Sequence, residues 1–457
     1  MKRKLISTQS VRIVFLVLLL SCTQSPEKEY TNKPPNFIVL LADDQAWSGT
    51  SVRMDLRSLV SKSDYYETPN LERLAETAVR FSRGYAASSV CAPTRYSIQF
   101  GQAPTRLNRT YVGDFDPKIA HDTLLSIPKM LREINGLYHC AHFGKWHLEM
   151  LPGALGYNES DGLTTNREGG FGATAEHDSV SIQRDPKLTK SLSYHGADYM
   201  ERMVEWNKPF YLQLSYYANH TYVTASQERV AKYQKKVRGK IHDNPYIAAM
   251  TEDLDEGIGI VLDKIKELGI EDHTYIIYLA DNGSIPAFNP LIKKDTTLNF
   301  PLSGGKWDVH EGGVRVPFLM AGPGLKQNTQ FDQPVYSADL LPTIADLADP
   351  TYRLPDYMDG GSIVKALQRN NPVQRSFDGL LFDFPKLGKW AMLNPARAWL
   401  EADYKLIYDL RDSTYSLFQV STDIREIHPL DTLEYAGTYE SYKEKMNNAY
   451  AKMKGDK

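Results

Sequence analysis

The chain has 457 residues, of which 42% are hydrophobic and 24% charged, and it contains neither a low-complexity tract nor a repeat of fixed period. This composition is typical of a folded globular protein and excludes a disordered or fibrous chain. The 53 basic and 56 acidic residues give a formal net charge of −3, which argues against a nucleic-acid partner.

The N-terminus has the order of an export signal. Basic residues precede an apolar stretch, Ile13 to Leu20, that is too short to span a bilayer comfortably. Ser21 before Cys22 resembles a bacterial lipobox, in which the cysteine becomes the lipidated first residue; a plain signal peptide with an incidental Cys22 is the alternative. We therefore expect a signal peptide over residues 1–21 and an exported protein in the periplasm or at the cell surface. A lipid on Cys22 would tether it to a bacterial membrane as an outer-membrane lipoprotein.

Short apolar runs that end in polar residues recur along the chain and predict buried strands. They cover Asn36 to Ala42, Tyr138 to Phe143, Phe210 to Tyr216 and Thr274 to Ala280. Helical patterns lie between them, notably TPNLERLAETAVRF (68–81) and IAAMTEDLDEGIGIVLDKIKELG (247–269). Strands that alternate with helices predict an α/β fold with a largely parallel sheet, covered by helices on both faces.

The pattern changes after Gly360-Gly361-Ser362 to strand-like pieces and a final charged helix from about Tyr439. We expect a linker over residues 22–35, the main domain over 36–370, and a smaller α+β subdomain over 371–457.

Two acidic pairs stand directly after predicted strands. Asp43 and Asp44 follow the first strand, and Asp281 and Asn282 follow a later one. Ligands of such sheets gather beyond the carboxyl ends of the strands, so these side chains are expected to converge. Four hard oxygen donors without histidine favour Ca²⁺ over zinc, with Mg²⁺ as the second choice. For either pair taken alone, a solvated turn or a helix cap is the alternative.

The most informative stretch is Cys91-Ala92-Pro93-Thr94-Arg95, which continues to Gly101. A lone cysteine is most often a buried, inert thiol. This stretch, however, resembles the signature of the formylglycine-dependent (type I) sulfatases, in which C-x-P-x-R followed by a glycine directs oxidation of the cysteine.

Further blocks carry the same resemblance. His142 to His147 (HFGKWH) is similar to the family's G-K-W-H block, and Asn219-His220-Thr221 follows a strand as the family's second histidine does. Ser303 to Lys306 (SGGK), EGGVRVP (311–317) and the closing EADYKLIYDL…DIREIHPL segment also match. The resemblance covers nearly the whole exported chain except the loop between Gly153 and Lys190.

The resemblance implies an alkaline-phosphatase-like fold: a large mixed, mostly parallel sheet between helices, with a smaller C-terminal α+β subdomain. It implies a sulfuric ester hydrolase of the exported bacterial type, acting on a sulfated carbohydrate. A formylglycine-generating or anaerobic sulfatase-maturating enzyme would convert Cys91 to formylglycine (3-oxoalanine). The metal set would be Asp43, Asp44, Cys91, Asp281 and Asn282.

The implied catalytic roles are equally specific. The hydrated aldehyde at position 91 would supply the nucleophile, beside Arg95. Lys145 and Lys306 would bind sulfate oxygens, His220 would protonate the leaving oxygen, and His147 would deprotonate the second hydroxyl of the hydrate.

Several alternatives stay open. A phosphomonoesterase or phosphonate hydrolase of the same superfamily would share the sheet. A hydrolase using the Cys91 thiolate, or a sulfoglycan-binding protein without activity, would share some of the residues. Ulvan, carrageenan, fucoidan and glycosaminoglycan substrates are not separated by the sequence.

Aromatic residues are the expected contacts for sugar rings. The tyrosine pairs at 65–66 and 216–217 lie near predicted site loops, and core or surface packing, the role of most tyrosines, is the alternative. Trp307 and His310 depart from the residues usual in the family between the G-G-K and E-G-G blocks, and we expect them to shape a subsite.

Overall fold

The computed structural model describes residues 33–113, 121–170, 181–286, 298–369, 371–386 and 393–455. From Pro34 onward the chain forms one compact unit. The expected signal peptide over residues 1–21 and the expected lipid on Cys22 lie outside the described residues. Within the described ranges, none of the helices has the length and apolar character needed to cross a bilayer.

An eight-stranded sheet forms the centre of the unit, in the order β11-β2-β10-β9-β1-β7-β4-β5. Its strands are β1 (Asn36–Ala42), β2 (Ala78–Phe81), β4 (His139–Gly144), β5 (Glu159–Ser160), β7 (Phe210–Ser215), β9 (Thr274–Ala280), β10 (Phe318–Ala321) and β11 (Thr329–Phe331). Strands β9, β1, β7, β4 and β5 run parallel, whereas β10 pairs antiparallel with β9 and with β2. The sheet is therefore mixed and mostly parallel, as expected.

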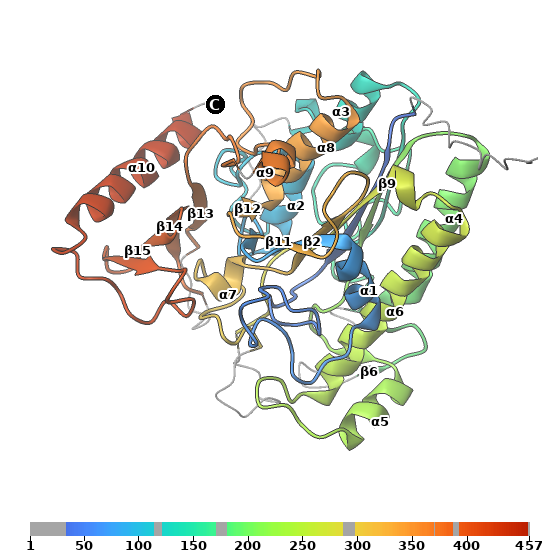
Figure 1. Ribbon diagram of the computed structural model, residues 1–457, viewed down its shortest axis with the longest axis horizontal. Helices are drawn as coiled ribbons and strands as arrows, with labels where there is room; N and C mark the ends of the chain where they lie inside the picture. Colours follow the sequence, from blue (N-terminus) through green and yellow to red (C-terminus); the bar gives the residue numbers. More distant parts are fainter. Residues whose placement is uncertain are drawn as a thin grey trace, which may run out of the picture. The chain divides into compact units, whose positions relative to one another are not determined.

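Both faces of the sheet are buried, which explains the continuous apolar runs of its strands. On one face, Ile38 and Leu40 of β1 join a core with α1 (Pro69–Thr77), α4 (Thr189–Glu205) and α6 (Pro245–Glu267). On the other face, Phe37, Val39 and Leu41 join a core with α2 (Cys91–Phe100), α3 (Ile127–Ile134) and α8 (Leu340–Ala348). Figure 1 shows α4 and α6 side by side and α2 near α8.

The pattern over residues 68–81 forms a shorter helix than expected. Helix α1 ends at Thr77, and Ala78–Phe81 forms strand β2. Val79 and Phe81 favour strands, and β2 gains pairing partners on both sides, with Met320 of β10 opposite Val79 and Phe331 of β11 opposite Phe81. Tertiary pairing thus overrides the helical spacing at this point.

The smaller C-terminal α+β part is confirmed. Four antiparallel strands, β13 (Leu380–Phe384), β14 (Ala396–Glu401), β15 (Tyr404–Asp409) and β16 (Tyr415–Gln419), form its sheet. Helix α10 (Ala436–Gly455) buries Met446 and Met453 in a cluster with Trp399 and Leu406. The boundary at residue 370 stays a prediction.

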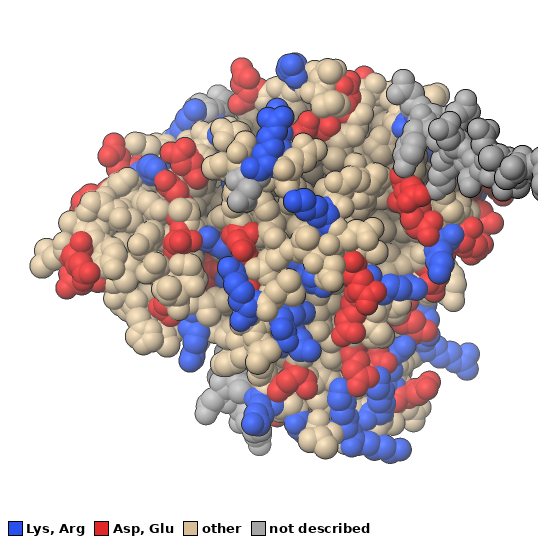
Figure 2. All heavy atoms as spheres, in the orientation of Figure 1, with Lys and Arg blue, Asp and Glu red and all other residues tan. Residues whose placement is uncertain are grey.

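Shorter elements complete the described chain. Strand β3 (Gly84–Tyr85) pairs with β12 (Val335–Tyr336), and β6 (Ser181–Ile182) pairs with β8 (Thr224–Ala225). The remaining helices are α5 (Gln227–Lys235), α7 (Glu311–Val314) and α9 (Val364–Arg369). On the face drawn in Figure 2, basic and acidic side chains are interspersed in the region of α5 and α6, where Lys232 pairs with Glu252.

Candidate active site

The two acidic pairs meet at one edge of the sheet. Asp43 follows β1 and Asp281 follows β9, and these strands are parallel neighbours. The backbone N–H of Asp44 donates to Oδ1 of Asp281 at 3.1 Å. Asp43, Asp44, Asp281 and Asn282 are all buried, so the pairs are not solvated turns.

Each of the three carboxylates has a cationic partner from a distant part of the chain. Lys145 Nζ lies 2.6 Å from Asp43 Oδ2, and Lys306 Nζ lies 2.8 Å from both oxygens of Asp44. The carboxylate of Asp281 accepts from Nε and Nη2 of Arg95 at 2.9 and 2.7 Å. Oppositely charged partners at these distances offset the large cost of burying charge.

Cys91 is the first residue of α2, so it lies at a helix N-terminus, the end of a helix that favours anions. Its Sγ lies 3.4 Å from Nδ1 of His147. Ligand atoms of Cys91, Asp43 and Asp281 all lie within 4.8 Å of one another. Burial raises the pKa of the Cys91 thiol, and Lys145 and Lys306 oppose this effect. The thiol therefore stays protonated near neutral pH.

The residues at this sheet edge fit a hard cation. Among the described residues, Asp43 Oδ1 and Asn282 Oδ1 are buried oxygens without a hydrogen-bond partner. Burial and the nearby carboxylate of Asp43 raise the pKa of Asp281, and Arg95 only partly offsets this rise. Unsatisfied oxygens and crowded carboxylates are the donor set that Ca²⁺ prefers.

Both predicted histidines lie at this cluster. His147 contacts Cys91, and Nε2 of His220 lies 3.7 Å from Asp44 Oδ2. Burial is the main cause that lowers the pKa of each, and nearby cations, Lys145 for His147 and Lys306 for His220, lower it further. Both imidazoles are thus neutral at pH 7 before an anion binds. The structure brings together all the catalytic and metal positions that the sequence predicts.

Two nearby residues were missed by the sequence reasoning. Thr164 accepts from the N–H of Trp146 at 2.9 Å, and its carbonyl accepts from the N–H of His147 at 2.9 Å, so it holds the G-K-W-H loop. Lys187 is buried and donates to the carbonyl of Gly169 at 3.0 Å. Burial lowers its pKa to about 8, against the opposing effect of Asp43. Both belong to the loop that matches no family block, and no local pattern marks them.

For the two tyrosine pairs the packing alternative is confirmed, and the suggested sugar contacts are wrong. Tyr65, Tyr66, Tyr216 and Tyr217 are all buried in the hydrophobic core and offer no face to a sugar. Trp307 is partly exposed, and its ring centre lies 5.5 Å from Nζ of Lys306.

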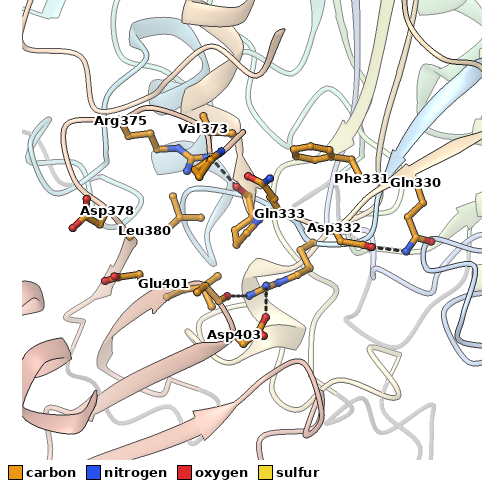
Figure 3. A pocket seen from close by; sticks show the side chains of 16 residues that line it. Gln330, Phe331, Asp332, Gln333, Val373, Arg375, Asp378, Leu380, Glu401 and Asp403 are labelled. Carbon is orange, nitrogen blue, oxygen red and sulfur yellow. Dashed lines mark hydrogen bonds and ion pairs between the residues drawn. The ribbon is translucent and has the colours of Figure 1, made fainter. Parts of the chain in front are cut away.

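A cavity of about 690 Å³ lies elsewhere, between the main sheet region and the C-terminal strands (Figure 3). Its arginines are already paired, Arg83 with Asp403 and Arg375 with Asp339. None of the described residues that line it belongs to the candidate active site.

Comparison with known proteins identifies the family. The sulfatase family model matches residues 35–350. The chain belongs to the sulfatase family, and it is a sulfuric ester hydrolase. A sulfatase from Formosa agariphila is 26% identical over 91% of this chain and 88% of its own length. Human N-acetylgalactosamine-6-sulfatase is 26% identical over 75% of this chain and 67% of its own length.

Solved structures confirm the fold. Ps i-CgsB in complex with k-i-k-neocarrahexaose has a TM-score of 0.75 at 23% identity, over 92% of this chain and 93% of that one. The phosphonate monoester hydrolase of Agrobacterium radiobacter has a TM-score of 0.64 at 17% identity, over 92% and 96%. The fold is thus shared with a phosphonate hydrolase, which was one of the alternatives left open by the sequence. The match to the sulfatase family model favours sulfate esters over phosphonates as the substrate class.

Proposed function

We propose that this protein removes sulfate from a sulfated carbohydrate, with Cys91 converted to formylglycine and with Ca²⁺ held by Asp43, Asp44, residue 91, Asp281 and Asn282. The observation that carries the proposal is the position of Cys91. It stands at a helix start, 3.4 Å from a histidine and beside the buried carboxylates of Asp43 and Asp281 with their cationic partners.

The nucleophile would be one hydroxyl of the hydrated aldehyde at position 91. That hydroxyl would release its proton to solvent and form an O–S bond, while the bond between sulfur and the sugar oxygen breaks and the sugar oxygen leaves with a proton from His220. His147 then takes the proton of the second hydroxyl, the C=O bond re-forms, and sulfate departs. Addition of water restores the hydrate. A single hydroxyl or thiol could not expel sulfate in this way.

The charged residues have separable roles in this scheme. Lys145 and Lys306 would bind sulfate oxygens, and Arg95 holds Asp281 and the carbonyl of Lys145. Burial lowers the pKa of His220 most, and the ammonium groups of Lys306, Lys145 and Lys187 lower it further; a bound sulfate would offset these charges and so favour the protonated form of His220. Ca²⁺ would polarise the sulfate oxygens and lower the pKa of the nucleophilic hydroxyl. An oxygen cage supplied by the protein suits Ca²⁺ better than Mg²⁺, which usually keeps several waters.

The thiolate alternative is less well supported. A cysteine hydrolase needs a lowered thiol pKa, whereas burial raises the pKa of Cys91. It would also leave the unsatisfied oxygens of Asp43 and Asn282 without a function.

A carbohydrate substrate is proposed from the relatives. A neighbouring structure holds k-i-k-neocarrahexaose, and a relative bears the name N-acetylgalactosamine-6-sulfatase. The test is sulfate release from defined carrageenan, ulvan, fucoidan and glycosaminoglycan oligosaccharides by the matured protein. We expect turnover of at least one. Turnover of phosphonate or phosphate monoesters, with none of any sulfated sugar, would contradict the proposal.

Export with a lipid on Cys22 is proposed from the order of the first residues alone. Wild-type protein should enter the membrane fraction, and Cys22→Ala should release it. An N-terminus other than Cys22 on the wild-type protein would contradict the lipid.

A further inference from the structure

Trp307 lies beside Lys306, one of the two lysines proposed to bind sulfate, and has no role in the proposed reaction. It follows Lys306 directly, and the centre of its ring lies 5.5 Å from the ammonium of that lysine. Lys306 and Cys91 are buried, whereas Trp307 is partly exposed. The indole therefore lies where the buried cluster meets its accessible side.

The backbone of Trp307 is held in an unusual conformation. Its φ of +72° lies in the left-handed region, which is costly for a bulky residue and persists only where neighbours enforce it. Its N–H donates to the carbonyl of Ser89 at 3.0 Å, and its carbonyl accepts from the N–H of Asn394 at 3.2 Å. Ser89 lies two residues before Cys91, so the backbone of Trp307 is fixed relative to the nucleophile.

The surroundings of Trp307 suit an apolar ligand face. The ring packs on the hydrophobic cluster that contains Val90, Cys91 and Val309. The charged side chains that follow Trp307, Asp308 and His310, form an ion pair with Nδ1 of His310 2.6 Å from Oδ1 of Asp308, so their charges offset each other. Although burial lowers the pKa of His310, Asp308 and Glu426 outweigh it and raise this pKa to about 9.

We propose that Trp307 is the stacking platform for the sugar ring that carries the scissile sulfate. A sulfate oxygen bound by Lys306 would place the attached ring within reach of the indole. A pyranose presents an apolar face of C–H groups, and a rigid aromatic ring buries such a face at little cost in conformational entropy. This inference rests on the proposed function and adds the residue that selects a sugar over other alcohols.

The test compares Trp307→Ala and Trp307→Phe with the wild-type protein, using the oligosaccharide of the above panel that it desulfates fastest. We expect KM to rise roughly tenfold or more for Trp307→Ala, as expected for a lost aromatic contact, and less for Trp307→Phe. The inhibition constant of inorganic sulfate, which has no sugar, should stay unchanged. Trp206→Ala is the matched control, because Trp206 is exposed and lies just before β7, at the opposite end of the strands.

Each outcome decides the matter. An unchanged KM in Trp307→Ala would overturn the platform. An equal loss of inorganic-sulfate binding would also overturn it, because Trp307 would then act by holding Lys306. If Trp307→Ala does not fold, an unchanged KM in Trp307→Phe together with an unchanged KM in Trp307→Leu overturns it. Failure of the proposed function is distinguishable, since the wild-type protein would then release no sulfate from any oligosaccharide.

Discussion

Cys91→Ser, produced without the maturation enzyme, is expected to lose at least roughly 10³-fold in turnover of the sulfated oligosaccharide, as for removal of an essential nucleophile. Serine offers one hydroxyl, so a sulfate transferred to it has no second hydroxyl to expel it. The variant should be inert or accumulate as sulfated protein, which intact-protein mass spectrometry detects as added sulfate.

The matched control for this variant is Cys140→Ser. Cys140 is the other buried thiol of the described chain, and it lies within β4, away from the carboxylate cluster. It should keep its turnover at temperatures where it stays folded. Equal activity of Cys91→Ser and the wild-type protein would remove the proposed nucleophile.

Asp281→Asn is expected to lower kcat by roughly 10²-fold or more, in line with the loss of an oriented electrostatic group, and to abolish stoichiometric calcium. The substitution keeps the shape of the side chain but removes the charge that faces Arg95 and the proposed cation. Turnover and metal content by elemental analysis are measured on the same preparation.

Asp263→Asn is its control, because Asp263 is an exposed carboxylate on α6 that pairs only with Arg73 among the ion pairs of the described chain. It should change neither quantity. Stoichiometric zinc without calcium in active wild-type protein would contradict the proposed metal.

The sequence predicts the central strands well because they are buried on both faces. The runs from Asn36 to Ala42 and from Thr274 to Ala280 are strands over those same residues. The helix pattern at 68–81 fails at Ala78, because β2 is selected by its pairing with β10 and β11 and not by local spacing.

For the site, the family blocks bring the right residues together, but their contacts are not local. Lys145 meets Asp43 from 102 positions away, and Lys306 meets Asp44 from 262. Lys187 and Thr164 could not be predicted, since they lie in a loop without a pattern. The four tyrosines were suggested as sugar contacts but are buried in the core, because a sequence does not distinguish a buried aromatic ring from an exposed one.

The most direct test of the central claim is mass spectrometry of the wild-type peptide that spans Cys91, from protein produced with a maturation enzyme. We expect residue 91 to be formylglycine, seen as the aldehyde or its hydrate, in proportion to the specific activity of each preparation. Fully active protein with an unmodified thiol at Cys91 would contradict it.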